Sequence, residues 1–163
     1  MCRFSLLQIG TVELKVLIAC GSEEVGRELT RQITACEGVR IVGWTYTDDE
    51  TVQATAALRP DLLVFHVPSR GYPQGALFRR LRAAQPQLRT LAVGCEPHEV
   101  GAYFLELAPL GLSGCVCRGG EQELREALCV LGHGGSLYLC PRASQAIVEA
   151  YRRQSRRWSR ERV

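Results

Sequence analysis

The sequence predicts an α/β fold of the flavodoxin-like class: a doubly wound, parallel (βα)5 sheet with strand order 2-1-3-4-5 and an extra C-terminal helix. β-prone apolar runs alternate five times with segments of helical periodicity, which favours right-handed crossovers and helices on both faces of one sheet. The run LLVF at residues 62–65 is continuously apolar, as in a strand buried on both faces. The length of 163 residues suits one domain with a proper core.

The expected elements follow one another in strict alternation. The apolar runs predict strands at residues 15–20, 39–46, 62–67, 90–94 and 113–117. Apolar residues spaced along one helical face predict helices at residues 23–36, 48–58, 74–84, 97–108 and 122–131. We expect residues 68–73 to form a loop and residues 136–140 a short apolar piece. A last helix begins at Pro141, a favoured first position, and ends near residue 157.

The starts of the first two helices have recognisable capping residues. Ser22 precedes the first helix and can accept a hydrogen bond from its first turn. Asp48 or Asp49 is the expected cap of the second helix. The inner side of that helix is expected to carry apolar residues: Val52, Ala56 and Leu58.

Composition and charge restrict the class of protein. Apolar runs are far shorter than the ~18 residues of a membrane span, and the N-terminus lacks the pattern of a signal peptide, so we expect a cytoplasmic protein without membrane contact. Residues 141–163 contain seven arginines and two glutamates, a balance of +5. Since the whole chain carries +3, the remainder carries −2. Without a secretion signal, the eight cysteines favour reduced thiols, metal ligation or redox sensing over a disulfide scaffold.

Several phrases carry a resemblance to a known family: LKVLIAC, VRIVGWTYTDDETVQATAALRPDLLVFHV, LFRRLRAAQPQLRTLAV, LGLSGCVCRGGEQELREAL and VLGHGGSLYLCPRAS. Over residues 14–150 the chain resembles a bacterial response-regulator receiver domain of the subfamily that precedes LuxR-type DNA-binding domains. We accordingly divide it into an N-terminal extension (1–13), a receiver-like domain (14–135) and a basic C-terminal helix and tail (136–163). The resemblance implies a role in two-component signal transduction or transcriptional control, and not an enzyme.

The positions that the family uses for chemistry have all changed. Receivers accept a phosphoryl group on an aspartate at the end of the third strand, where this chain has His66. The two acidic residues that hold Mg²⁺ are replaced by Cys20 and Gly21. A Thr or Ser that closes the fourth strand is replaced by Gly94, and the Lys that ends the fifth strand by Arg118. The aromatic switch residue is replaced by Cys115.

These changes predict a degenerate receiver, or pseudo-receiver, that signals through protein partners without aspartyl phosphorylation. Mg²⁺ requires an octahedral set of oxygen ligands, and none of the three expected positions carries a carboxylate, so we expect no Mg²⁺ and no other cofactor. Arg118 has lost its acidic neighbours. It could face solvent, pair with Glu96 or Glu121, or bind an anionic ligand.

A first alternative is a metal- or thiol-based redox sensor. Cys20, His66 and Cys95 lie at or just past the ends of neighbouring strands, at a spacing that suits two thiolates and an imidazole around Zn²⁺ or part of an iron–sulfur cluster. Glu96, His98 or water could then be a fourth ligand. The structural alternative is that the cysteines are small buried hydrophobes and that His66 is bonded to a backbone carbonyl.

A second alternative is a DNA-binding regulator, or the receiver fragment of one, because the chain ends before the helix-turn-helix that the family would place next. The basic tail could contact phosphates through four arginines: Arg152, Arg153, Arg156 and Arg157. The resemblance also implies a homodimer or partner face. It would include Tyr103, Leu107, Leu124, Leu128 and the edge near Cys115, although most of these residues must first fill the core.

Overall fold

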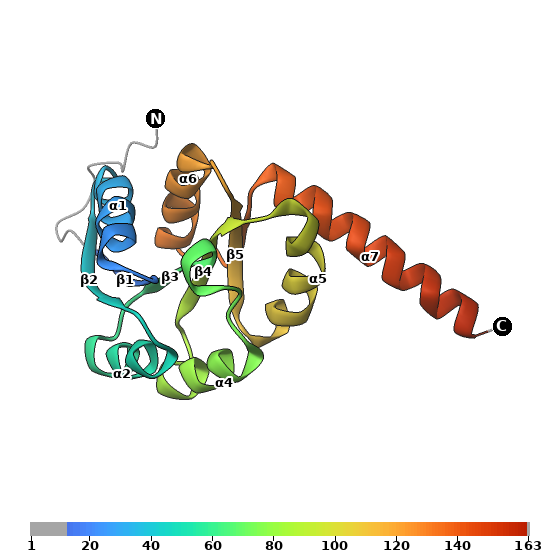
Figure 1. The fold of residues 1–163 in the computed structure, drawn as a ribbon, viewed down its shortest axis with the longest axis horizontal. Helices are drawn as coiled ribbons and strands as arrows, with labels where there is room; N and C mark the ends of the chain where they lie inside the picture. Colours follow the sequence, from blue (N-terminus) through green and yellow to red (C-terminus); the bar gives the residue numbers. More distant parts are fainter. Residues whose placement is uncertain (1–12, 163) are drawn as a thin grey trace.

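The computed structural model describes residues 13–162, and within them it has a parallel sheet of six strands with helices on both faces (Figure 1). The strand order is β2-β1-β3-β4-β5-β6, which confirms the predicted flavodoxin-like order and adds one strand at its end. Of the proposed N-terminal extension, only Glu13 lies inside the described residues. The strands are β1 (Leu14–Ala19), β2 (Val39–Thr45), β3 (Leu62–His66), β4 (Arg89–Cys95), β5 (Leu112–Cys117) and β6 (Tyr138–Leu139).

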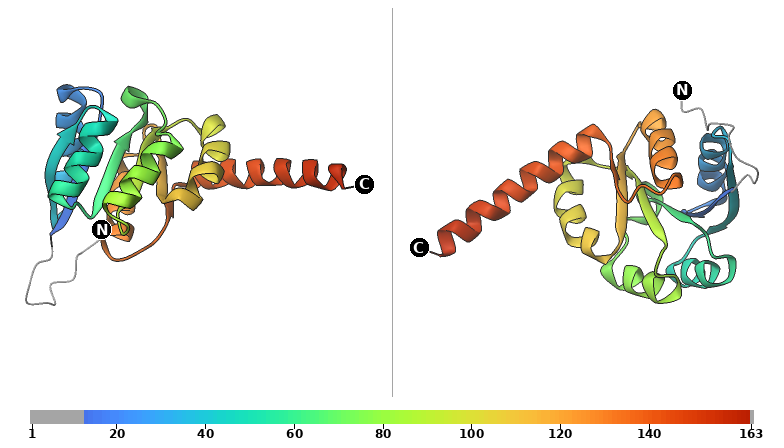
Figure 2. Two further views of the ribbon diagram at one scale, coloured as in Figure 1. Left: turned by 90° about the horizontal axis from the view of Figure 1, so that it is seen from below. Right: turned by 180° about the vertical axis from the view of Figure 1, so that it is seen from behind.

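The helices cover the sheet in two layers, each with its own core cluster (Figures 1 and 2). They are α1 (Glu23–Thr34), α2 (Asp48–Leu58), α3 (Val67–Arg70), α4 (Gly75–Ala84), α5 (Pro97–Leu107), α6 (Glu121–Gly132) and α7 (Pro141–Glu161), with a 3₁₀ turn η1 (Ala108–Leu110). Helices α1 and α6 pack on one face of the sheet. Helices α2, α4 and α5 pack on the other. The apolar part of β3, residues 62–65, is at most 2% exposed, as a central strand requires.

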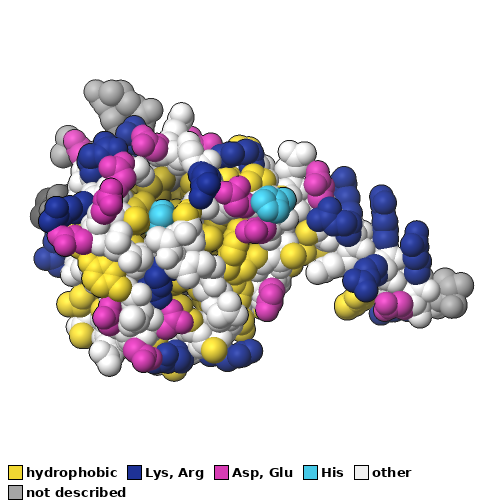
Figure 3. All heavy atoms as spheres, viewed as in Figure 1, with side chains coloured by type: hydrophobic (Ala, Val, Ile, Leu, Met, Phe, Trp, Pro, Cys, Tyr) yellow, Lys and Arg dark blue, Asp and Glu magenta, His cyan; other side chains and the backbone are white. Residues whose placement is uncertain are grey.

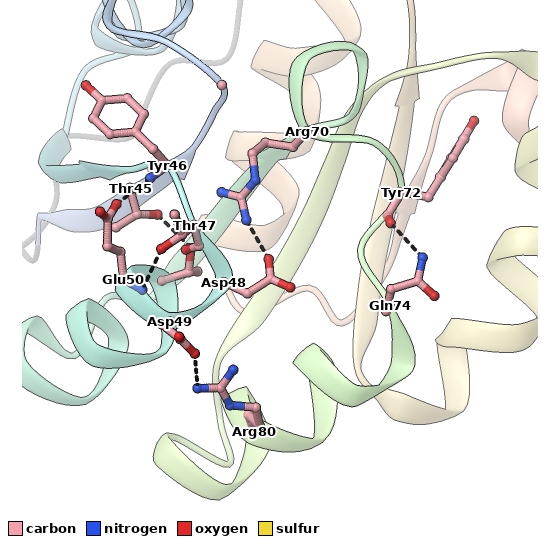
Figure 4. A network of polar contacts seen from close by, with 12 residues as sticks. Thr45, Tyr46, Thr47, Asp48, Asp49, Glu50, Arg70, Tyr72, Gln74 and Arg80 are labelled. Carbon is pink, nitrogen blue, oxygen red and sulfur yellow. Dashed lines mark hydrogen bonds and ion pairs between the residues drawn. The ribbon is translucent and has the colours of Figure 1, made fainter.

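The N-cap of α1 is as predicted, but that of α2 is not. The Ser22 hydroxyl accepts a hydrogen bond from the Val25 N–H at 3.3 Å. Helix α2 is capped by Thr47, whose Oγ1 accepts from the Glu50 N–H at 3.2 Å (Figure 4). Asp48 and Asp49 instead lie in the first turn, where a negative charge suits the helix dipole.

The predicted inner side of α2 is right for Val52, which packs partly buried against the core, and wrong for Ala56 and Leu58. Thr51 and Thr55 are fully buried, whereas Leu58 is 41% exposed and Ala56 lies on the surface. The threonines can be buried because their hydroxyls are bonded. Thr51 Oγ1 lies 2.7 Å from Thr45 Oγ1 and donates to the Thr47 carbonyl, and Thr55 Oγ1 donates to the Thr51 carbonyl. A polar inner face of this kind is invisible to a search for apolar periodicity.

Two further segments differ from expectation. The predicted loop after β3 begins with α3, a single helical turn that follows His66 directly. The apolar piece at residues 136–140 supplies β6, which pairs in parallel with β5 through Gly114↔Tyr138 and Cys115↔Leu139.

Helix α7 is longer than predicted and reaches Glu161. Its first half packs on α5 at a close crossing, where a Cβ on Gly101 would lie 2.5 Å from the Ala146 carbonyl oxygen. Beyond Ala150 every described residue of α7 is exposed, and the helix projects away from the domain (Figures 1 and 2). No helix within residues 13–162 has both the length and the apolar character needed to cross a membrane.

Candidate functional site

The changed positions of the receiver-like pocket come together at the carboxyl edge of the sheet. Cys20 and Gly21 follow β1, His66 ends β3, Gly94 is the second-last residue of β4 and Arg118 follows β5. Parallel strands place their carboxyl ends at one edge, which is where ligands bind in open α/β sheets. The predicted grouping of these five residues is therefore reproduced by the fold.

The space between these positions is filled by the chain itself. Turn α3 folds back over the edge, so that Ser69 lies on Gly21: the Gly21 N–H donates to Ser69 Oγ at 2.9 Å, and a Cβ on Gly21 would lie 2.7 Å from Ser69 Cβ. Pro68 lies on Gly94, where a Cβ would be 2.6 Å from the proline Cγ and Cδ. Real Cβ atoms do not approach so closely, so α3 can occupy this place because residues 21 and 94 are glycines.

His66 is tied to the same turn. Its Nδ1 lies 2.7 Å from Ser69 Oγ. Because that oxygen accepts from the Gly21 N–H, its own proton can go to Nδ1, which places the neutral ring's proton on Nε2. Burial lowers the pKa of the imidazole, and the Arg118 guanidinium lowers it further. The expected bond to a backbone carbonyl is wrong: the partner of His66 is a hydroxyl.

Arg118 adopts one of the arrangements that the sequence leaves open. Its guanidinium Nη1 lies 3.4 Å from Glu96 Oε1, and the two side chains are 67% and 38% exposed. An ion pair this exposed is screened by solvent and is worth ~0–1 kcal/mol. Arg118 is thus held only weakly at the edge of the site.

The three residues of the predicted metal site do not converge. Cys20 belongs to the core under α1 and α6, and its Sγ donates to the Ser22 carbonyl at 3.4 Å. Cys95 belongs to the core on the opposite face of the sheet. Within residues 13–162, no group of three or more His, Cys, Asp or Glu side chains is arranged to hold a metal ion.

Sequence reasoning missed a cluster of four buried thiols beneath α5 and α7. Cys95, Cys115, Cys117 and Cys140 are each at most 1% exposed. Burial and the neighbouring Cys140 raise the pKa of Cys117 to about 12, and a hydrogen bond with Cys95 followed by burial raises that of Cys115. Thiols held protonated in this way pack as small hydrophobes. The spacing of Cys115 and Cys117 in a strand, two residues apart, was the signal that they share a face.

A second missed residue is Arg70, which anchors turn α3. Its side chain is only 9% exposed, its guanidinium lies 5.0 Å from the centre of the Phe65 ring, and Nη2 is 2.5 Å from Asp48 Oδ1 (Figure 4). Its Nη1 has no hydrogen-bond partner among the described residues. The first turn of α2 therefore holds the end of α3 in place through a largely buried charge.

A pocket of about 520 Å³ opens beside the filled edge, between α1 and α6; we call it the α1–α6 pocket. Figure 3 faces this side and shows apolar side chains in a hollow with charged side chains around it. Its wall includes His66, Pro68, Gly94 and Arg118. Its floor consists of branched apolar side chains from α1, β4, β5 and α6: Val25, Leu29, Val93, Val116 and Leu124.

The predicted partner face is largely interior. Leu107, Leu124 and Leu128 are at most 3% exposed, as expected of residues needed by the core. The Tyr103 ring lies 4.1 Å from that of Tyr72, and its hydroxyl donates to the Pro73 carbonyl. Strand β6 pairs with the edge of β5 beside Cys115, so this edge is covered by the chain's own later segment.

Known proteins resemble the chain at low identity. No family model matches it. It is 24% identical over 136 residues to the response regulator GacA of Pseudomonas syringae pv. syringae and to that of Pseudomonas aeruginosa, an alignment that covers 82% of this chain and 62% of each relative. The chain thus spans about three-fifths of the length of these relatives.

Solved structures agree on the architecture. The isolated REC domain of RcsB from Salmonella enterica serovar Typhimurium, determined with the phosphomimetic BeF3⁻, has a TM-score of 0.69 at 19% identity and covers 83% of this chain and 99% of its own. A LuxR-family two-component response regulator from Aurantimonas sp. has a TM-score of 0.71 at 21% identity, over 84% and 96% of the two chains. The protein has the fold of a response-regulator receiver domain. In this structure α3 lies over the carboxyl edge of the sheet, against Gly21 and Gly94.

Proposed function

We propose that this protein is a pseudo-receiver: a response-regulator receiver domain that acts through protein partners, without aspartyl phosphorylation and without catalysing a reaction, in signal transduction or transcriptional control. The observation that carries the proposal is the position of α3. Ser69 and Pro68 lie against Gly21 and Gly94, the positions where the family has a metal-binding acid and a hydroxyl.

Two physical requirements of phosphoryl transfer support the proposal. Mg²⁺ is bound by oxygen ligands in an octahedron and neutralises the charge on the transferring group. At the three corresponding positions this chain has a buried thiol, a glycine and a neutral imidazole. Arg118 is a cation near the edge, but it is weakly held by Glu96 and lacks the metal and hydroxyl that would act with it.

The test is incubation with acetyl phosphate and Mg²⁺, followed by intact-mass measurement. We expect an unchanged mass under conditions in which the receiver domain of a GacA protein gains one phosphoryl group. The variant His66→Ala distinguishes an imidazole adduct from an aspartyl adduct. A stable species heavier by one phosphoryl group, assigned by peptide mapping to an Asp or to His66, contradicts the proposal.

A second candidate function is DNA binding, and α7 is the observation that favours it. Relatives such as RcsB have been solved in complexes with DNA. In this chain the distal part of α7 is exposed over its whole circumference, and its arginines at helical spacing lie within one arc of it. A basic helix face of this kind can neutralise phosphates without reading sequence. The arginines concerned are Arg152, Arg153, Arg156 and Arg157.

A further inference from the structure

The α1–α6 pocket has the volume of a small-molecule site. Protein interiors are packed with few voids larger than a water molecule, and ligand sites typically span ~300–1,000 Å³. The pocket measures about 520 Å³, whereas the second pocket found within the described residues measures about 30 Å³. A space of this volume at the carboxyl edge of a parallel sheet is where small molecules bind in this class of fold.

Three glycines line the α1–α6 pocket. Gly94, Gly119 and Gly120 form part of its wall. At Gly119 the backbone has φ +82°, and an added Cβ would meet nothing within 4 Å, so that part of the wall borders open space. The floor is firm, because Val93, Val116 and Leu124 are at most 4% exposed and belong to the core under α1 and α6.

Two hydrogen-bond donors belong to the lining of the pocket. The neutral His66 ring directs Nε2 toward Gly94, 4.0 Å from the place of its missing Cβ. When Nδ1 accepts a hydrogen bond from the Ser69 hydroxyl, the proton of the neutral ring is on Nε2. The Arg118 guanidinium is the second donor, and an incoming anion would compete only with one exposed contact to Glu96.

Three carboxylates on α1 and α6 line the pocket, Glu24, Glu28 and Glu121, and two of them have hydrogen-bond partners. Glu28 accepts from the guanidinium of Arg31 at 2.6 and 3.1 Å and from Gln32 at 2.8 Å. Glu121 accepts from Gln32 at 3.3 Å. These bonds partly neutralise two of the three carboxylates, while the donors His66 and Arg118 line the pocket from β3 and from the residue after β5.

We propose that the α1–α6 pocket binds a small organic acid: a flat apolar body on the valine and leucine floor, with a carboxylate bonded to His66 Nε2 and Arg118. The proposal rests on the proposed function in one respect only, that no phosphoryl group uses these donors. The two can fail separately, because phosphorylation is read by mass and ligand binding by titration.

The probes are three compounds with one apolar body and different charge: 2-naphthoate, 2-naphthol and 2-(aminomethyl)naphthalene. Each is titrated into the whole chain by calorimetry and by amide chemical shifts. We expect naphthoate to bind tightest and the amine weakest. Because Arg118 would form a charge-assisted hydrogen bond with the carboxylate, Arg118→Gln should weaken the affinity for naphthoate about tenfold. Arg125 is an exposed arginine on α6 outside the pocket lining, so Arg125→Gln should leave that affinity unchanged.

A variant that fills the pocket locates the site. Val25 lines it from α1, so Val25→Trp should abolish naphthoate binding and Val25→Ala should not. If Val25→Trp does not fold, the site is located in the unchanged protein by naphthoate-induced chemical-shift changes of the Val93, Val116 and Gly119 amides. The proposal is overturned by an absence of saturable binding up to a few millimolar, by equal or tighter binding of the amine, by binding that survives Arg118→Gln, or by inorganic phosphate competing as well as naphthoate.

Discussion

The close contact between Pro68 and Gly94 predicts a large cost for adding one methyl group. Gly94 has φ +76°, and a Cβ there would lie 2.6 Å from two atoms of the proline ring. An L-residue in this left-handed region costs about 1–2 kcal/mol, and overpacking against a rigid ring adds about 1–3 kcal/mol. Gly94→Ala should therefore lower the free energy of unfolding by about 2–5 kcal/mol, a fall in Tm of roughly 5–15 °C for a domain of this length.

A matched control separates backbone strain from the contact. Gly119 has a similar φ of +82° but open space at its Cβ, so Gly119→Ala should cost only the strain, about 1–2 kcal/mol. Urea denaturation of the unchanged protein, Gly94→Ala, Pro68→Ala and the double variant forms a double-mutant cycle, and Gly119→Ala is measured beside it. We expect a coupling of about 1–3 kcal/mol between positions 68 and 94. Equal costs at the two glycines, with no coupling, would show that α3 does not lie on Gly94.

Three further perturbations follow from the structure. Arg70→Met removes a largely buried charge from above Phe65 and should lower the free energy of unfolding by about 1–3 kcal/mol. Arg80→Met removes an exposed ion pair with Asp49 and should lower it by less than ~1 kcal/mol. Equal urea midpoints for the two variants would contradict this. Because the folded-state pKa of His66 is below its usual 6.5, the native state binds fewer protons than the unfolded chain, so stability should fall as pH drops below about 6.5. His66→Asn should flatten that slope between pH 7 and 5, and an unchanged slope would refute it. Duplex DNA binding through α7 should weaken steeply as the salt concentration rises. Even at low salt, binding should be absent in a variant with four arginines changed to Gln: Arg152, Arg153, Arg156 and Arg157.

Much of the architecture could be predicted because buried strands and helices have apolar residues at regular spacings in the sequence. The apolar runs predicted the five main strands, their alternation with helices predicted a fold class with the observed strand order, and Ser22 indicated the start of α1. The failures occur where polar groups are satisfied by one another. Buried Thr51 and Thr55 look like surface residues in a sequence, although their hydroxyls are bonded inside the fold. Strand β6 was missed because two residues are too few for a periodic signal.

The site was only half predictable for a related reason. The sequence indicated which residues stand at the carboxyl ends of the strands, because the apolar runs mark where the strands end. It could not reveal what occupies the vacated space, because that depends on the path of the chain after β3. The predicted convergence of Cys20 and Cys95 failed on orientation: neighbouring strand ends are close, but alternation placed the two thiols on opposite faces.

Gly21 and Gly94 are therefore best understood together with α3. In a receiver domain that had only lost its acidic residues, the phosphoacceptor site would stay open, and the single substitution His66→Asp would begin to restore phosphorylation. In this chain the missing side chains and the turn are complementary, since Ser69 and Pro68 occupy the places where Cβ atoms would stand. Restoring acids at position 21 or a hydroxyl residue at position 94 would require α3 to move, against the anchor that Arg70 forms with Asp48. We accordingly expect His66→Asp alone to remain unphosphorylated by acetyl phosphate, and phosphorylation of that single variant would show that α3 opens readily.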